Sequence, residues 1–391
     1  MTHALDWVIA GSYTSRYAFT GPAAVSIDLT NRCDARCRYC WNYSPHVPVR
    51  DAAWQRQELT LPVLTRVLRE LRDWQTQRIM FAGGGEPLLH PESGRIVLLL
   101  SELSLPFSLL TNGYYLTEQL MPVLKDAPLL RLGVSVWAAT PATYARLHAG
   151  RIAADFTRVM DNIKRFRQVR PDVPVVITHV IGRENCTELE AMYAMAAAQD
   201  INALLLVPQG MTEPGLQDSS LAGLPLPAKL RVRETLLRLH ADGKVPLQHF
   251  SHHFGRFCRL MRLEETQGPV AAGPAEPCYS GWQFMRILAD GSVRPCYCDQ
   301  LPAMGNVNRQ HLREIWNGPA YYVFRRQCMQ APAAPPYFDG QICRTACDNH
   351  DDNARVRTAL ARANWRDRWR RLLLAGRGSG WRIGGGELPT S

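Results

Sequence analysis

The feature that most constrains the fold is a regular alternation of short apolar segments with amphipathic helical segments between residues 23 and 210. Strands that alternate with helices in this way indicate a parallel sheet. Six such units predict an α/β fold with a partial (β/α)6 TIM-like barrel, shorter than a complete barrel. The expected strands span residues 24–28, 78–82, 107–110, 132–136, 175–180 and 203–207, and the expected helices span 61–74, 117–125, 156–167 and 186–199.

The rest of the chain shows a weaker pattern. Pro and Gly interrupt it at 213–227, a helical pattern covers 228–241, and cysteines return between Cys278 and Cys347. A basic helix is expected at 354–374, before a Gly-rich end. We therefore expect an N-terminal segment at 1–22, the barrel at 23–215, a bridging region at 216–275, a small cysteine-rich domain at 276–350, and a basic C-terminal helix and tail at 351–391.

Composition narrows the class of protein. The 391 residues are 46% hydrophobic, and no apolar run approaches the roughly 18 to 20 residues of a membrane span. No secretory signal is visible, so we expect a cytoplasmic protein whose eleven cysteines are metal ligands or free thiols. The net charge of +10 comes mainly from arginine, since only four of 45 basic residues are lysine. We interpret it as a solvated basic surface, with an anionic ligand left open, and expect neither a nucleic-acid nor a membrane partner.

Three cysteines, Cys33, Cys37 and Cys40, follow the first expected strand in a C-x3-C-x2-C run. A structural zinc ion usually takes four protein ligands, whereas a [4Fe–4S] cube held by three thiolates keeps one iron open for a substrate or cosubstrate. A zinc knuckle or incidental cysteines are the alternatives. The spacing favours the iron–sulfur cluster.

This run, with Tyr39 just before its third cysteine, resembles the signature of the radical S-adenosylmethionine (SAM) enzymes. The resemblance implies that the open iron chelates SAM and that an electron from the cluster cleaves SAM to a 5′-deoxyadenosyl radical. It also places Tyr39 near the adenine of SAM.

Further motifs follow the next strands. Gly83-Gly84-Gly85-Glu86-Pro87 is similar to the GGE motif of the family, and Thr111-Asn112-Gly113 to its TNG turn. The resemblance assigns SAM contacts to Gly84, Gly85, Glu86, Asn112, Ser135 and Arg146.

Arg146 has a structural alternative as an exposed helix arginine. The sequence also departs from the family here. Trp137 stands where many relatives have an acidic residue, and His148 where an arginine is frequent.

A second cysteine group has the spacing C-x12-G-x4-C, from Cys278 through Gly291 to Cys296, with a C-x3-C pair downstream. This pattern is similar to the SPASM and twitch extensions that bind auxiliary iron–sulfur clusters. Asp290-Gly291 predicts a tight hairpin. We expect one auxiliary [4Fe–4S] cluster, with a zinc ribbon as the alternative and Cys298 and Cys328 as spare or alternate ligands. The expected ligands are Cys278, Cys296, Cys343 and Cys347.

Two cysteines lie outside these groups. Cys186 is expected to be structural, on the exterior of the barrel, and Cys258 ends a His-rich tract in the bridging region. Packing or a substrate-facing loop is the favoured role of that tract, with metal binding as an alternative. Cys258 or Cys298 is the candidate donor that returns a hydrogen atom to a substrate radical.

The expected activity is hydrogen abstraction followed by oxidative modification, such as dehydrogenation or C–C or C–S bond formation, in peptide maturation or specialised-metabolite biosynthesis. Dehydrogenation or epimerisation of a sugar or aminocyclitol is the alternative, and an iron–sulfur redox scaffold or sensor is the non-enzyme alternative. An external electron donor such as flavodoxin or ferredoxin is expected. Only about 22 residues precede the first strand, too few for the leader-peptide-binding domain that many peptide-modifying relatives carry there, which argues against a peptide substrate unless a separate protein recognises it.

Overall fold

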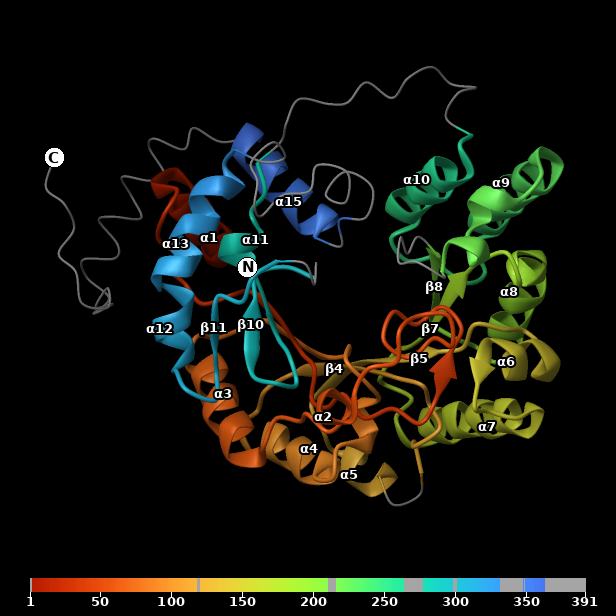
Figure 1. Cartoon of the computed structure of the whole chain (residues 1–391), viewed down its shortest axis with the longest axis horizontal. Coiled ribbons are helices and arrows are strands. Elements are labelled where there is room, and N and C mark those ends of the chain that lie inside the picture. The colour runs from red at the N-terminus through yellow and green to blue at the C-terminus, as the bar shows by residue number, and fades with distance from the viewer. Residues whose placement is uncertain are drawn as a thin grey trace, which may run out of the picture.

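The computed structural model describes residues 2–117, 120–209, 216–263, 277–297, 301–330, 347 and 349–362. Its central feature is a nine-stranded sheet with the order β11-β10-β9-β1-β3-β4-β5-β7-β8. The sheet curves into an open barrel, with helices on its outer side (Figure 1).

The six strands expected from the sequence form the parallel part of this sheet, and the fold class is confirmed. Each pairs in parallel with its neighbour, as in the register Ile27↔Phe81. Their bounds are β1 (Ala24–Ile27), β3 (Arg78–Phe81), β4 (Phe107–Thr111), β5 (Leu129–Ser135), β7 (Val175–Ile181) and β8 (Ala203–Pro208).

Helices lie between and after these strands, and most of them cover the outside of the barrel (Figure 1). In α3 the buried side chains Leu64, Val67, Leu68 and Leu71 recur at helical spacing, and Pro62 occupies the first turn. The helices of this part are α2 (Ala52–Gln55), α3 (Leu61–Asp73), α4 (Ser93–Glu102), α5 (Met121–Lys125), α6 (Pro141–Leu147), α7 (Ala153–Val169), α8 (Leu189–Ala198), α9 (Leu226–Asp242) and α10 (Phe250–Met261).

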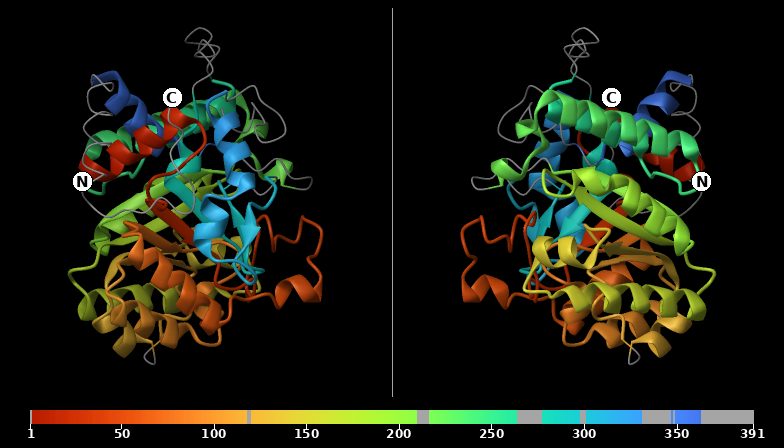
Figure 2. Two further views of the ribbon diagram at one scale, coloured as in Figure 1. Left: turned by 90° about the vertical axis from the view of Figure 1, so that its left-hand side faces the viewer. Right: turned by 90° about the vertical axis from the view of Figure 1, so that its right-hand side faces the viewer.

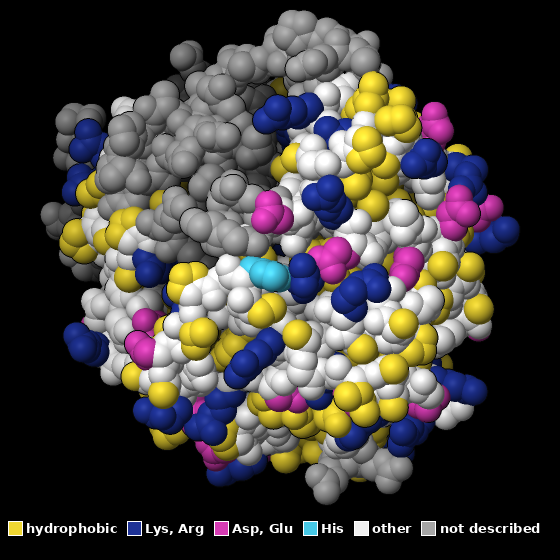
Figure 3. All heavy atoms as spheres, turned by 45° about the vertical axis from the view of Figure 1, so that its right-hand side comes forward, with side chains coloured by type: hydrophobic (Ala, Val, Ile, Leu, Met, Phe, Trp, Pro, Cys, Tyr) yellow, Lys and Arg dark blue, Asp and Glu magenta, His cyan; other side chains and the backbone are white. Residues whose placement is uncertain are grey.

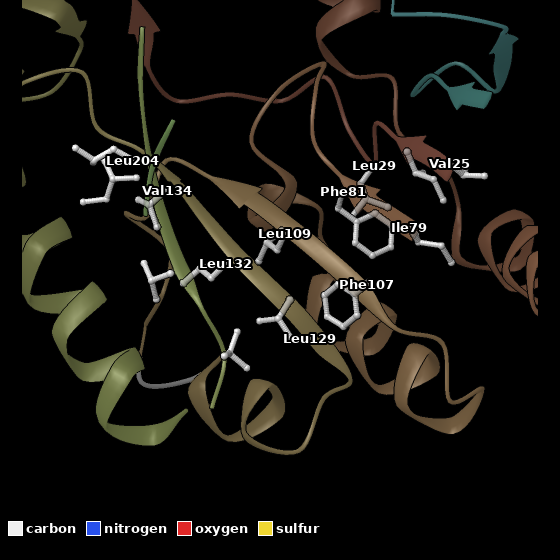
Figure 4. Packing of buried hydrophobic residues seen from close by; sticks show 14 of the residues in the cluster. Val25, Leu29, Ile79, Phe81, Phe107, Leu109, Leu129, Leu132, Val134 and Leu204 are labelled. Carbon is white, nitrogen blue, oxygen red and sulfur yellow. The ribbon is translucent and has the colours of Figure 1, made fainter. Parts of the chain in front are cut away.

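The core lies between the sheet and these helices. Side chains alternate along each strand, so Val25 and Ile27 pack outward with their neighbours on adjacent strands, while Ser26 lies on the opposite face. Figure 4 shows the packing of this outward layer, which includes Phe81 and Phe107. Burial of each large apolar side chain contributes roughly 1.5 to 3 kcal/mol.

The cysteine-rich part continues the same sheet. β9 (Phe284–Ile287) pairs in parallel with β1, and β10 (Ser292–Arg294) and β11 (Gly305–Asn306) follow in antiparallel order. The hairpin predicted at Asp290-Gly291 is present between β9 and β10, and Gly291 adopts φ 83°, which favours glycine. β9 therefore covers the edge of β1 that β3 leaves open, and the backbone N–H and C=O groups along that edge gain hydrogen-bond partners.

Helices near both ends of the described chain cover this part. α1 (Thr2–Thr14) contacts α11 (Ser280–Gln283) and α15 (His350–Arg362), and α12 (Leu312–Trp316) and α13 (Pro319–Cys328) lie beside them. The expected basic helix thus begins at His350, and its part beyond residue 362 lies outside the described residues.

Two further observations concern the surface. Among the described residues, no helix is both long and apolar enough to cross a membrane. On the face shown in Figure 3, Lys and Arg side chains are scattered among acidic and apolar ones rather than gathered in one patch.

Candidate active site

Cys33, Cys37 and Cys40 lie on the loop that follows β1, at the carboxyl end of that strand. All three are partly buried thiols outside any disulfide. Burial raises the pKa of Cys33 to about 12, and burial together with the neighbouring thiols Cys33 and Cys40 raises that of Cys37 well above its usual value. The three thiols are therefore neighbours in the fold.

The donor set consists of three thiols on one short segment, Cys33, Cys37 and Cys40. Three thiolates can hold a four-iron cube and leave one iron open. The residues present thus fit a [4Fe–4S] cluster.

An ion pair fastens the cysteine loop to the chain after α6. Arg151, whose side chain is 6% exposed, lies 2.6 Å from Asp34, and the Tyr115 hydroxyl donates to the same carboxylate at 2.6 Å. A short ladder between β2 (Arg36–Cys37) and β6 (His148–Ala149) adds backbone bonds. Asp34 and Arg151 were not predicted from the sequence, although a carboxylate inside a cysteine loop is a signal for a cationic partner.

His148 and two aromatic rings line the loop behind Cys37. His148 Nδ1 lies 3.2 Å from Cys37 Sγ, and the Trp137 N–H donates to His148 Nε2 at 3.2 Å. Burial lowers the pKa of His148 to about 3, so the ring is neutral. Trp137 stacks on Tyr39, with ring centroids 5.7 Å apart. Tyr39 is buried beside this wall, and its place next to adenine stays a prediction.

The glycine turn after β3 packs directly on the cysteine loop. Gly83 and Gly84 have φ of 77° and 47°, and a Cβ on Gly85 would lie 2.1 Å from the Arg32 carbonyl oxygen, just before Cys33. The Asn42 amide donates to the Gly84 carbonyl at 3.1 Å. The backbone of the glycine turn thus lies against the cysteine loop, and the binding of SAM by this turn stays a prediction.

Glu86 joins the turns that follow β3 and β4. Its carboxylate accepts hydrogen bonds from the Thr111 hydroxyl at 2.6 Å, the Asn112 N–H at 2.7 Å and the Leu88 N–H at 3.1 Å. Burial raises its pKa to about 7. Glu86 therefore organises the site from within the protein, and its contact with SAM stays a prediction. Thr111 was identified from the sequence as the start of the TNG turn, but its hydrogen bond to Glu86 was not predicted.

The remaining predicted SAM ligands have different surroundings. Ser135 ends β5 at the same edge of the sheet, and Asn112 Oδ1 accepts from the Tyr114 N–H at 2.9 Å. Arg146 is half-exposed and donates at 3.2 Å to both the Thr143 hydroxyl and the Glu184 carbonyl. These contacts are typical of an exposed arginine on a helix, which is the alternative to a SAM contact given for Arg146 above.

A polar pocket of about 200 Å³ opens beside Gly84. The segment that contains α2 projects from the body of the molecule there (Figure 2) and supplies Arg50 and Trp54, while the hairpin supplies Arg286 and Arg294. The pocket thus lies between the glycine turn and the cysteine-rich part of the sheet.

The second cysteine group brings together thiols that are distant in sequence. Cys328 donates a hydrogen bond to Cys278, which lowers the pKa of Cys278 to about 6. Amide groups from the start of α15 face the same sulfurs: Asn353 Nδ2 lies 3.8 Å from Cys278 and Asn349 Nδ2 lies 3.7 Å from Cys296. The structure therefore places Cys328 with the expected ligand Cys278.

The other predicted cysteines are placed as follows. Cys347 is partly buried, whereas Cys298 and Cys343 lie outside the described residues. Cys258 lies on α10, a helix that packs against β8 and α9, so the His-rich tract is helical rather than a loop. Cys186 is 6% exposed and belongs to the main core.

Two family profiles match the chain. Residues 27–196 match the radical SAM superfamily, and residues 278–348 match SPASM, an iron–sulfur cluster-binding domain.

Curated relatives and solved structures are similar over most of the chain. PqqA peptide cyclase of Gluconobacter oxydans is 26% identical over 311 residues, covering 78% of this chain and 79% of the relative. AdoMet-dependent heme synthase of Methanosarcina barkeri is 26% identical over 319 residues, covering 78% and 84%. SuiB of Streptococcus suis bound to its precursor peptide SuiA has a TM-score of 0.58 at 16% identity, covering 78% and 67%.

Proposed function

Because the chain belongs to the radical SAM superfamily and carries a SPASM iron–sulfur domain, we propose that it oxidatively modifies a peptide by removing hydrogen from carbon. The chain is an enzyme that uses SAM and [4Fe–4S] clusters, rather than a redox scaffold. A cluster with bound SAM supplies a 5′-deoxyadenosyl radical, which abstracts a hydrogen atom from an unactivated C–H bond.

One observation supports this reaction type more than any other: the glycine turn packs on the loop that bears the three thiols. Cys33, Cys37 and Cys40 would hold the cluster, and the turn next to Arg32 would hold SAM against the open iron. The protein's own contribution is to orient both groups and to exclude water.

The second thiol group supports a net oxidation. A substrate that loses a hydrogen atom must also lose one electron and one proton to form a double bond or a new bond. Cys278, Cys296 and Cys328 would hold an auxiliary cluster that accepts this electron, with Cys343 or Cys347 as the fourth ligand. The electron used to cleave SAM would come from a flavodoxin or ferredoxin, in the reducing cytoplasm where these thiols stay free.

The substrate class rests on the curated relatives. PqqA peptide cyclase is named for a peptide, which supports the peptide proposal. AdoMet-dependent heme synthase is named for a small molecule, which keeps a small-molecule substrate as the second candidate. The polar pocket beside Gly84 is the proposed entry for either substrate. A separate protein that recognises the peptide is part of this proposal.

The test is anaerobic reconstitution of the full chain with iron and sulfide, followed by dithionite and SAM. We expect 5′-deoxyadenosine from the wild type and from a Cys186→Ala control, and none from Cys33→Ala, Cys37→Ala or Cys40→Ala. The absence of 5′-deoxyadenosine from the wild type would refute the enzyme proposal. Co-expression with candidate short peptides encoded by neighbouring genes should give a peptide that has lost two hydrogen masses. Turnover of a small molecule alone would overturn the peptide assignment.

A further inference from the structure

We propose that His148 is a positioning residue that donates a hydrogen bond from Nδ1 to the sulfur of Cys37 and thereby raises the reduction potential of the cluster at this loop. The inference rests on the proposed function, since it concerns the cluster that Cys37 would hold. It assigns a role to a side chain that is not itself a ligand.

The position of the imidazole proton follows from the neighbours of the ring. The Trp137 backbone N–H donates to Nε2 at 3.2 Å, and a nitrogen that accepts a hydrogen bond in a neutral imidazole carries no proton. The proton is therefore on Nδ1. This atom lies 3.2 Å from Cys37 Sγ, so the N–H is directed at the sulfur.

The fold holds this donor in place. Cys37 and His148 are register partners in the β2–β6 ladder, and the Arg38 N–H donates to the Leu147 carbonyl at 2.7 Å. The imidazole packs against Tyr144, with ring centroids 4.3 Å apart, and is 2% exposed. The ring is thus buried and held by its neighbours with Nδ1 beside the sulfur.

The expected effect follows from charge. A reduced cluster is more negative than an oxidised one, so a donor to a ligating sulfur stabilises the reduced state more. His148 would therefore make the cluster easier to reduce by a weak donor. The second cysteine group has a parallel arrangement, because the Asn349 and Asn353 amides face the sulfurs of Cys296 and Cys278.

Two substitutions separate the hydrogen bond from packing. Asn carries its amide nitrogen on Cγ, as His carries Nδ1, so His148→Asn keeps a donor near the same position, whereas His148→Leu removes it. The measurement is a redox titration of the reconstituted full chain, followed by the EPR signal that changes when SAM is added. That signal belongs to the cluster with the open iron.

At the midpoint potential of the wild type, we expect the ratio of reduced to oxidised cluster to fall about tenfold in His148→Leu, equivalent to 59 mV for a one-electron couple. His148→Asn should remain near the wild type. The proposal is overturned if the cluster of His148→Leu has the same midpoint potential as that of the wild type. It is also overturned if the midpoint potential of His148→Asn is lowered as much as that of His148→Leu while both variants retain their iron.

A second measurement covers the case in which His148→Leu does not fold. Wild-type protein labelled with ¹⁵N-histidine should show a ¹⁵N coupling to the reduced, SAM-responsive cluster, and His148→Asn should lose it. Absence of the coupling in the wild type also overturns the proposal. A wild type without a SAM-responsive signal or 5′-deoxyadenosine would instead contradict the proposed function.

Discussion

Asp28 and Arg286 form a buried, two-point ion pair that links the start of the barrel to the cysteine-rich part. Arg286 Nη2 lies 2.8 Å from Asp28 Oδ2 and Nε lies 3.3 Å from Oδ1, with side chains 5% and 2% exposed. Gly83 lies against the same carboxylate, since a Cβ there would be 2.3 Å from Oδ1. One carboxylate therefore contacts both the glycine turn and β9.

Breaking this pair should destabilise the fold strongly. Arg286→Met leaves the Asp28 carboxylate buried without its partner, which costs about 3 to 5 kcal/mol. Urea unfolding of the apoprotein measures the loss, and the double variant Asp28→Asn with Arg286→Met should recover part of it. Arg95→Met is the control, because the exposed Arg95–Glu92 pair contributes only about 0 to 1 kcal/mol. Equal losses for Arg95→Met and Arg286→Met would contradict the prediction.

The glycine turn should not tolerate a side chain. Gly85→Ala places a Cβ against the Arg32 carbonyl, so the cysteine loop must move, and we expect loss of bound iron and at least about tenfold less 5′-deoxyadenosine. Gly94→Ala in α4 is the matched control, because nothing lies within 4 Å of the new Cβ. The control should keep the iron content and the 5′-deoxyadenosine yield of the wild type. Normal iron content in Gly85→Ala would argue against the packed turn.

Glu86 should make stability depend on pH. Burial raises its pKa from 4.5 to about 7, so between these values the native state keeps a proton that the unfolded state has released. The contribution of Glu86 to the free energy of unfolding therefore falls as the pH rises through this window, by at most about 3 kcal/mol. In urea unfolding of apoprotein from pH 5 to 7.5, the free energy of unfolding of the wild type minus that of Glu86→Gln should fall by this amount. The buried His148, whose pKa is lowered, contributes equally to both proteins and cancels in this difference. Parallel profiles of stability against pH for the wild type and Glu86→Gln would contradict this prediction. Glu92→Gln is the control for a glutamate at the surface.

Cys328 should be required for the auxiliary cluster. Its thiol contacts Cys278, so Cys328→Ala should lower the iron content of the reconstituted chain from about eight to about four atoms. Cys186→Ala, in the main core, should retain about eight. Iron analysis alongside the EPR signal that responds to SAM shows which cluster is lost. Full iron content in Cys328→Ala would show that Cys328 is not a ligand.

Local patterns in the sequence predicted much of the architecture. Short apolar runs in the sequence predicted β1 (Ala24–Ile27) and the five parallel strands that follow it. This was possible because the apolar pattern of each strand lies within a few consecutive residues. The same holds for the cysteine loop and for the hairpin at Gly291, where short-range geometry decides the residue types. The His-rich tract was harder to interpret, and its helix α10 depends on packing against β8 and α9.

The sequence by itself thus determined the α/β barrel, the family and the thiols that can hold clusters. Only the tertiary structure decided which of these parts are in contact. β9 pairs with β1, and Cys328 contacts Cys278. Arg286 contacts Asp28 although 258 residues separate them in sequence, and His148 contacts Cys37 at a separation of 111 residues. The physical reason is that strand pairing and side-chain hydrogen bonds between distant segments depend on register in the folded sheet, which no local spacing encodes.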